Sequence, residues 1–375
     1  MPLNNLYQDY PPTSRVDFFL FFLVFLFLVF GLVMITSSST LIGLNQYKDS
    51  FFFVKRHIVF MIIGFFAFLS SYVLPHFVWR KFAFSLWVLS LLFVALTYIP
   101  GVGMTVGGSS RWIYILGLRF QPSEVLKFTL ILYMAHLLDI NKDRLFDFKN
   151  TLLPLLAVIG ISIVVVLKQP DLGTSIVIGA VSFLMMFIAG TPAVYLSGIC
   201  FSSLLVVIIS IIKNPYQMNR VTAFLNPWND PYGTGFHVIQ SLIAVGTGGL
   251  FGLGLGESRQ KFFYLPQQYT DFIFSIVCEE FGFIFTTFFI LCFLFFVFRA
   301  FLISSRCPHL FSKLLVIGLC LWITLQAIVN ISVTLNLIPT TGITLPFISF
   351  GGTSLIMVMF ISGMILNISR YREHY

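Results

Sequence analysis

Three acidic residues lie close together in an otherwise apolar part of the sequence. Asp271, Glu279 and Glu280 fall within QYTDFIFSIVCEEFGF, although only 14 of the 375 residues are acidic. If this segment is helical, its rise places the two glutamates about 12–13 Å beyond the aspartate, at a depth where a span meets hydrocarbon. Carboxylates at that depth face protein or water. The spacing therefore predicts a polar cavity that is entered from the side of the preceding loop.

The position of Asp271 at the start of an apolar run allows two interpretations. An acid at the beginning of a helix can cap it or stabilise its first turn. Thr270 can provide the cap alone, which would leave Asp271 in the first turn and free for chemistry. Burial would raise the pKa of this carboxylate and a nearby Arg or Lys would lower it.

Two further pairs of ionisable residues occur at helical spacing or at a junction between apolar runs. Glu124 and Lys127, in FQPSEVLKF, lie at positions i and i+3 and so on one helix face. They can be a neutralising pair within the helix or part of a functional cavity. Lys168 and Asp171, in KQPDLGTS, flank a proline. Asp171 can cap the next helix or face the same cavity.

The composition requires a membrane environment. The chain is 58% hydrophobic and 10% charged, whereas a soluble domain has about 25% charged residues. The net charge of +8 comes from residues in short loops beside the apolar runs, which is typical of residues that flank spans and does not imply a nucleic-acid partner. The five cysteines form no CxxC pair and are expected to act as small hydrophobic residues.

Apolar runs of about 20 residues predict an all-α integral membrane protein with approximately ten transmembrane helices. The whole chain, residues 1–375, is expected to form one polytopic membrane domain. The first run reads as a retained span because the preceding residues lack a basic region and an A-x-A site. The expected spans are 17–36, 57–74, 81–100, 122–138, 151–167, 172–189, 192–212, 271–298, 314–336 and 344–367.

The distribution of basic residues does not set the orientation. With both termini inside, the inner loops and termini carry eleven Lys and Arg residues and the outer loops carry ten, which is nearly a tie by the positive-inside rule. Basic residues kept on the outer side can bind an anionic ligand there. They can also simply lie in a long loop that is translocated regardless of charge.

Residues 213–270 form the longest predicted loop, between the seventh and eighth spans. Its stretch 236–245 is amphipathic and predicts a helix that lies at the interface or folds back over the bundle. The glycines of GTGGLFGLGLGES lack the GK[ST] ending of a phosphate loop, so they favour a re-entrant turn. Motifs of the HExxH kind are absent, and none of the six histidines falls within YTDFIFSIVCEE.

Five long motifs resemble, in their order and spacing, those of the SEDS family (shape, elongation, division and sporulation). The resemblance extends over essentially the whole chain from Phe51 to Arg370. Two segments, GESRQKFFYLP and PTTGITLPFISFGG, resemble the division type, FtsW, more than the elongation type, RodA. The five motifs are RWIYILGLRFQPSEVLKF, KQPDLGTS, FLNPWNDPYGTGFHVIQSLIAVGTGGLFGLGLG, FYLPQQYTDFIFSIVCEEFGF and NLIPTTGITLPFISFGGTSL.

The resemblance implies a peptidoglycan glycosyltransferase that polymerises lipid II into glycan strands at the outer face of the bacterial cytoplasmic membrane. It implies ten helices, cytoplasmic termini, an extracytoplasmic loop at 213–270 and a role at the division septum. It also implies a class B penicillin-binding protein as partner, other divisome proteins, and a divalent cation (Mg²⁺ or Mn²⁺). The essential aspartate of the family corresponds to Asp271.

The resemblance also suggests a mechanism. A sugar hydroxyl attacks an anomeric carbon whose leaving group is a lipid pyrophosphate, so the reaction needs a base and cations. We expect Asp271 to be the base, with metal binding as its alternative role. Arg111, Lys168 and Arg220, with Lys55 or Arg56, are candidate pyrophosphate contacts, whereas Glu124, Lys127, Asp171 and Glu279 would shape the cavity.

The sequence departs from the family pattern just before Asp271. Family members have a glutamate and a histidine in PEAHTDF, where this chain has Gln267 and Tyr269. Two other functions therefore stay open. A lipid II flippase also needs intramembrane acids, but near the midplane and accessible from both sides. An inactive divisome scaffold would tolerate the two replacements.

Overall fold

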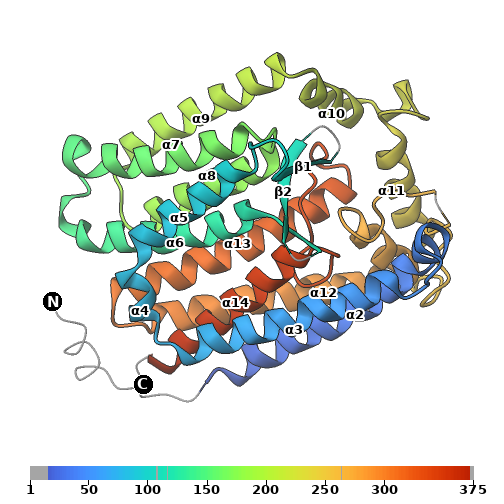
Figure 1. The fold of residues 1–375 in the computed structure, drawn as a ribbon, viewed down its shortest axis with the longest axis horizontal. Helices are drawn as coiled ribbons and strands as arrows, with labels where there is room; N and C mark the ends of the chain where they lie inside the picture. The colour runs from blue at the N-terminus through green and yellow to red at the C-terminus, as the bar shows by residue number, and fades with distance from the viewer. Residues whose placement is uncertain (1–15, 107–108, 116, 263, 372–375) are drawn as a thin grey trace.

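Long helices that lie side by side make up most of the molecule (Figure 1). The computed structural model describes residues 16–106, 109–115, 117–262 and 264–371. The prediction of a mostly helical membrane protein is confirmed. The helices of the first half are α2 (Phe18–Tyr47), α3 (Phe52–Val73), the short α4 (His76–Lys81), α5 (Ala83–Leu96), α6 (Pro122–Ile140), α7 (Leu153–Leu167), α8 (Leu172–Ile188) and α9 (Ala193–Lys213). Those of the second half are α12 (Ile273–Ser305), α13 (Leu310–Thr334) and α14 (Gly352–Ile368).

Each of the ten predicted spans overlaps one of these helices. Within the described part of the chain, seven segments are long and apolar enough to cross a membrane. Helices α5 and α8 are shorter, and α6 carries three charged residues. The number of ten crossings therefore stays a prediction. The seven segments are α2, α3, residues 148–167 with α7, α9, α12, α13 and residues 352–371 with α14.

Several predicted boundaries differ from the helix ends, and two of these differences concern the candidate site. Helix α12 begins at Ile273, so Asp271 precedes the helix and does not belong to its first turn. Helix α14 begins at Gly352, and residues 344–351 before it are not helical. Pro346 disfavours a helical conformation at the residue before it, which explains why the apolar pattern begins before the helix does.

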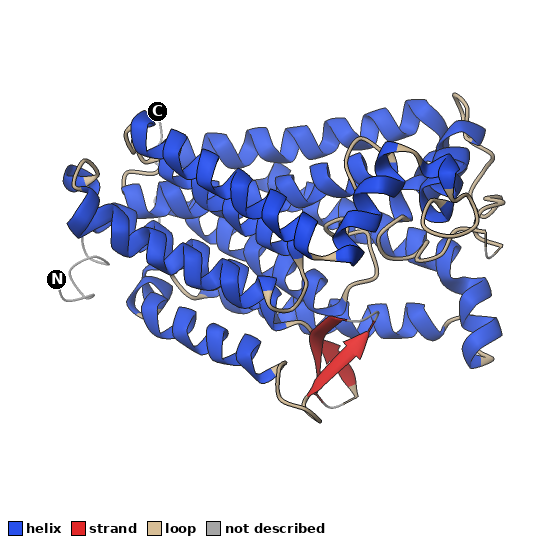
Figure 2. Ribbon diagram, turned by 90° about the horizontal axis from the view of Figure 1, so that it is seen from above, coloured by secondary structure: helices blue, strands red, loops and turns tan. Residues whose placement is uncertain are grey.

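A three-stranded antiparallel sheet joins α5 to α6, and the all-α prediction did not include it. Its strands are β1 (Gly103–Val106), β2 (Ser109–Ile115) and β3 (Leu118–Phe120), in the order β1-β2-β3. In Figure 2 it stands at the edge of the helices. Ile113 of β2 is buried and pairs with Phe120 of β3. This anchoring fixes the direction of β2, which carries one of the predicted site residues.

The long loop between α9 and α12 is folded. It contains α10 (Pro215–Leu225), the 3-10 turn η3 (Pro227–Asn229) and α11 (Phe236–Thr247). The predicted amphipathic helix is confirmed as α11, which packs on α12 through Val238, Ile239, Ser241 and Ala244. Residues 248–272 return to α12 mainly through turns.

Helix α12 is broken at Gly282, whose backbone angles are φ 73° and ψ −177°. Four main-chain hydrogen bonds of 2.9–3.1 Å join residues 249–254 of the long loop to the residues around the break. These bonds satisfy backbone groups that a break would otherwise leave unpaired within the apolar bundle. The loop is thus built into the helix that follows Asp271.

The two ends of the described chain meet at one end of the bundle. The main-chain N–H of Asp17, just before α2, donates to Ser369 Oγ at 3.3 Å. The Asp17 carboxylate caps α2 and also pairs with Arg299 of α12. Two residues of the charge count, Arg15 and Arg372, lie outside the described residues.

Candidate active site

Asp271 lies in the turn before α12 and is fixed there through its main chain. Asn330, a buried residue of α13, donates from Nδ2 to Asp271 O and to Ile343 O, both at 2.8 Å. Ser349 Oγ donates to Thr270 O at 2.7 Å. The turn that carries Asp271 is therefore bound to residues 335–351, the segment between α13 and α14.

Arg111 reaches the same region from β2. Its Nη2 donates to Pro170 O at 2.6 Å, and its Nε lies 3.6 Å from Asp171 Oδ2. Asp171 is the N-cap of α8, where it accepts bonds from Thr174 N at 3.1 Å and Thr174 Oγ1 at 2.9 Å. The capping interpretation of Asp171 is correct, and the same carboxylate also orients Arg111.

Arg220 approaches from α10 in the long loop. Its Nη1 donates to Thr340 O at 2.9 Å, and its guanidinium lies over the Tyr216 ring, 4.5 Å from the ring centroid. These contacts leave further N–H groups of both arginines for a ligand, because a guanidinium has five donors.

A glycine lies between the aspartate and one of these cations. A Cβ atom built on Gly342 would lie 3.6 Å from Asp271 Oδ2 and 4.0 Å from Arg111 Nη1. Asp271 and Arg111 therefore flank the same exposed point of the backbone. The structure thus brings together four residues from separate parts of the chain. They are Arg111, Asp171, Arg220 and Asp271, and they are called the Asp271 group below.

The surroundings of Asp271 raise the pKa of its carboxyl to about 6. Loss of hydration on burial is the largest cause, and Arg220 and Arg111 act in the opposite direction. The negative charge of Asp171 adds to the increase. A carboxylate with this pKa is ionised at neutral pH and still accepts a proton more readily than an ordinary aspartate, which suits a general base.

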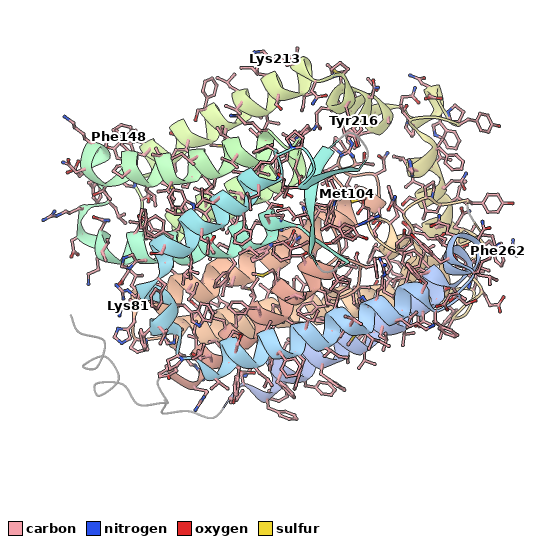
Figure 3. The ribbon with its side chains drawn as sticks, viewed as in Figure 1. Lys81, Met104, Phe148, Lys213, Tyr216 and Phe262 are labelled. Carbon is pink, nitrogen blue, oxygen red and sulfur yellow. The ribbon has the colours of Figure 1, made fainter. Side chains whose placement is uncertain are left out.

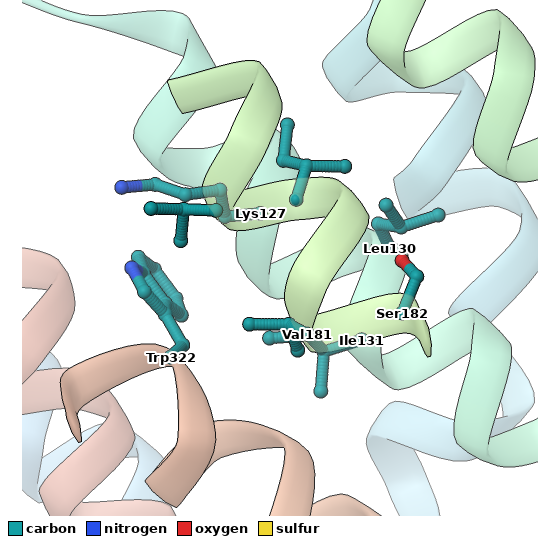
Figure 4. Close-up of a pocket in the computed structure, with 8 residues that line it drawn as sticks. Lys127, Leu130, Ile131, Val181, Ser182 and Trp322 are labelled. Atoms are coloured by element: carbon teal, nitrogen blue, oxygen red, sulfur yellow. The ribbon is translucent and has the colours of Figure 1, made fainter. Parts of the chain in front are cut away.

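Glu124 and Lys127 form a buried ion pair within α6, with Nζ and Oε1 2.7 Å apart. The Lys127 ammonium also lies 4.7 Å from the centre of the Trp322 ring. Figure 4 shows Lys127 and Trp322 beside a small pocket that α8 also lines. The α8 residues of this pocket lie 6 to 11 positions after Asp171, or about 9–17 Å along the helix by its rise of 1.5 Å per residue. Among the described contacts, none joins this pair to Asp271, Arg111 or Arg220, and its place in the cavity stays a prediction.

Glu279 and Glu280 contact the long loop. Glu279 accepts hydrogen bonds from Ser258 Oγ and from the main-chain N–H of Arg259 at 3.1 Å. Glu280 accepts from Ser37 Oγ at 2.5 Å and lies 3.6 Å from Lys261 Nζ. Among the described contacts, the three acids do not share a single cavity, because Glu279 is bound by the long loop and Glu280 by the loop and by Ser37 of α2.

The other predicted cations lie on the surface. Lys168 is exposed at the end of α7. Lys55 pairs with Asp49 at 2.7 Å, and the Arg56 guanidinium stacks on Phe52 at 4.4 Å. Among the described contacts, none joins these three residues to the Asp271 group.

The two residues that depart from the family pattern have structural contacts. Tyr269 packs against the rings of Phe53 and Phe350, with centroids 4.6 and 5.9 Å apart. Gln267 is exposed, and its Oε1 accepts a hydrogen bond from Thr270 Oγ1 at 2.9 Å. Both side chains therefore support the turn before Asp271.

Sequence reasoning missed Asn330 and Gly342. Asn330 could have been found as an amide within an apolar run, LQAIVNISV, where an unpaired polar group would be costly. Gly342 gives no such signal, because only the fold places it beside Asp271.

A divalent cation would find one free carboxylate here. The described residues contain no group of three or more His, Cys, Asp or Glu side chains arranged to hold a metal. Asp171 is already bound to Thr174 and Arg111. Asp271 alone fits the pattern of Mg²⁺, which takes one or two carboxylates and completes its shell with water and substrate phosphates.

Comparison with known proteins gives full-length matches. A family model described as a cell cycle protein, for FtsW, RodA and SpoVE, matches residues 18–374. The chain is 40% identical to a probable peptidoglycan glycosyltransferase FtsW of Geobacter sp. (strain M18), over 91% of this chain and 93% of that protein. It is 39% identical to stage V sporulation protein E of Bacillus subtilis (strain 168), over 96% and 98%.

Two solved structures are similar to this chain over nearly its whole length. A chain from a peptidoglycan synthase complex that coordinates polymerization and crosslinking matches with a TM-score of 0.78 and 29% identity, over 96% of this chain and 99% of that one. The rod shape determining protein RodA of Thermus thermophilus matches with a TM-score of 0.71 and 26% identity, over 97% and 100%.

Proposed function

Because the chain belongs to the FtsW, RodA and SpoVE family of cell cycle proteins, we propose that it is a peptidoglycan glycosyltransferase that polymerises lipid II during cell division. The observation that carries this proposal is the Asp271 carboxylate, with its pKa raised to about 6 beside Arg111 and Arg220. The chain is a multi-pass membrane protein, and we place it in the bacterial cytoplasmic membrane at the septum, with both termini cytoplasmic.

The proposed reaction uses these three groups in defined roles. Asp271 accepts the proton of an acceptor sugar hydroxyl while the hydroxyl oxygen forms a bond to the anomeric carbon of the donor. The bond from that carbon to the pyrophosphate oxygen breaks, and the polyprenyl pyrophosphate leaves with the electron pair. Arg111 and Arg220 stabilise the negative charge on the leaving group. In its alternative role Asp271 would instead hold a divalent cation together with the substrate's phosphates, and the cation would supply further positive charge.

The placement of the charged groups favours a polymerase over a flippase. Asp271 and Asp171 lie just before α12 and α8, and Arg111 and Arg220 lie in segments that connect the long helices, namely the sheet and α10. A flippase would need its charged site near the middle of the membrane. The Glu124–Lys127 pair is buried, but its two charges neutralise each other.

The partner is proposed from the same comparisons. A chain of similar fold is part of a complex that coordinates polymerization and crosslinking. We therefore expect this protein to work with a class B penicillin-binding protein, which would cross-link the strands, and with other divisome proteins.

The test is glycan-strand formation from lipid II in detergent, with and without the cognate penicillin-binding protein and Mg²⁺ or Mn²⁺. We expect Asp271→Asn to lower the rate by about 10²-fold or more, since general-base catalysis typically contributes 10²–10⁴-fold. Asp143→Asn removes an exposed carboxylate at the other end of the molecule and should retain activity. Absence of polymer from the wild type under all these conditions would contradict the proposed enzyme and favour a lipid II translocation assay.

A further inference from the structure

The space between the side chains of Asp271 and Arg111 lies over Gly342, which has no side chain. A Cβ on Gly342 would meet Asp271 Oδ2 at 3.6 Å and Arg111 Nη1 at 4.0 Å. Apart from the neighbours of Gly342, no other described heavy atom comes within 4 Å of that point. Gly342 is exposed, although Ile343 beside it is buried.

The backbone around Gly342 is fixed on both sides. Thr340 O accepts a hydrogen bond from Arg220, and Ile343 O accepts one from Asn330. The start of α8 also packs closely against this segment, because a Cβ at Gly173 would lie 3.0 Å from Thr341 Cβ. A side chain at position 342 could therefore not be accommodated by moving the segment away and would occupy the space between the base and the cation.

We propose that the bare face of Gly342 is the floor of the reaction subsite, over which the acceptor hydroxyl and the donor's first phosphate meet. The inference rests on the proposed function. The hydroxyl must come within hydrogen-bonding distance of Asp271, and the leaving phosphate oxygen must reach Arg111. The anomeric carbon then lies between these groups. Gly342 is a positioning residue, because it acts by leaving this space open.

Backbone strain must be separated from occlusion, since Gly342 has φ +78°. Gly190 provides a matched control, with φ +92°, nothing within 4 Å of its Cβ position, and a place in the α8–α9 connection. Alanine and asparagine variants at both positions distinguish the two causes. Asparagine tolerates a positive φ better than alanine does, but its side chain is larger.

The experiment measures kcat and KM for lipid II polymerisation, the melting temperature, and binding of a polyprenyl pyrophosphate in detergent. We expect Gly342→Asn to lower kcat by about 10²-fold, more than Gly342→Ala, because small misplacements at a reaction centre cost this much. Binding of the pyrophosphate should weaken at least several-fold in Gly342→Asn. Both Gly190 variants should keep wild-type kcat and binding.

Two results would overturn the inference. One is that Gly342→Asn has the same kcat and the same affinity for the pyrophosphate as Gly190→Asn. The other is activity that follows melting temperature alone, with alanine more harmful than asparagine. If the wild type makes no polymer, the proposed function fails, and the binding comparison still decides whether Gly342 forms the floor of a pyrophosphate site.

Discussion

At neutral pH, Asp271 is ionised and held beside two guanidinium groups, because its pKa of about 6 lies below the working pH. Burial and the arginines act on this pKa in opposite directions. Without the arginines the pKa of Asp271 would be higher, and its carboxylate would be protonated over a wider pH range. Without burial the pKa would be lower, and the carboxylate would be a weaker base. The residue's chemistry thus depends on contributions from β2, α10 and the start of α8.

The pKa of Asp271 predicts how polymerisation depends on pH. A base must be deprotonated to act, so kcat/KM should rise about tenfold per pH unit below 6 and level off above it. Arg220→Gln should move this rise to higher pH, because Arg220 lowers the pKa of Asp271. Arg259→Gln, an exposed arginine of the same loop, is the control. A profile that Arg220→Gln leaves unmoved, or moves to lower pH, would exclude Asp271 as the titrating base.

Among the elements, α12 connects the candidate active site most directly to the long loop. The half of the helix before Gly282 follows Asp271, and its Glu279 and Glu280 bind residues 258–261 and Ser37 of α2. Residues 249–254 fill the break in its main-chain hydrogen bonding. The glutamates and the break therefore hold the loop against the helix that follows Asp271.

The substitution Gly282→Ala, which adds a single methyl group, tests the break in α12. A Cβ at Gly282 would lie 2.2 Å from Gly252 N and 2.5 Å from Phe251 C, and φ +73° is unfavourable for alanine. Gly282→Ala should destabilise the protein by about 3 kcal/mol or more, through strain and a main-chain clash. Gly160→Ala, in α7 with nothing near its Cβ position, should be neutral or stabilising by about 0.5–1 kcal/mol. Thermal unfolding in detergent measures both, and equal melting temperatures would contradict the break as described.

Over the whole molecule, the Asp271 group and the chain ends lie at opposite ends of the bundle. Helix α6 begins beside the site, and α7 ends beside it. The residues that connect α6 to α7 therefore lie at the other end of the bundle. Figure 3 shows Phe148 of this connection and Tyr216 of the long loop far apart. If the membrane lies across the bundle, only one of these regions faces outward.

Labelling of cysteines introduced at exposed positions tests this topology. Tyr232 of the long loop is 93% exposed and Phe146 is 77% exposed. In a Cys200→Ser background, Tyr232→Cys should react with a membrane-impermeant maleimide on spheroplasts, and Phe146→Cys only after permeabilisation. The opposite pattern would place Asp271 on the cytoplasmic side and contradict an outer-face polymerase.

The amino-acid sequence by itself predicted the apolar helices and the helix in the long loop, and it singled out Asp271 as a candidate site residue. Apolar run length and a rare acid are local signals, because lipid penalises polar groups wherever they occur. Only the tertiary structure decided that Glu279 binds the loop, that a sheet carries Arg111, and that Asn330 and Gly342 adjoin Asp271. These contacts join residues far apart in the chain, and they depend on close packing and on the hydrogen bonds that buried main-chain groups require.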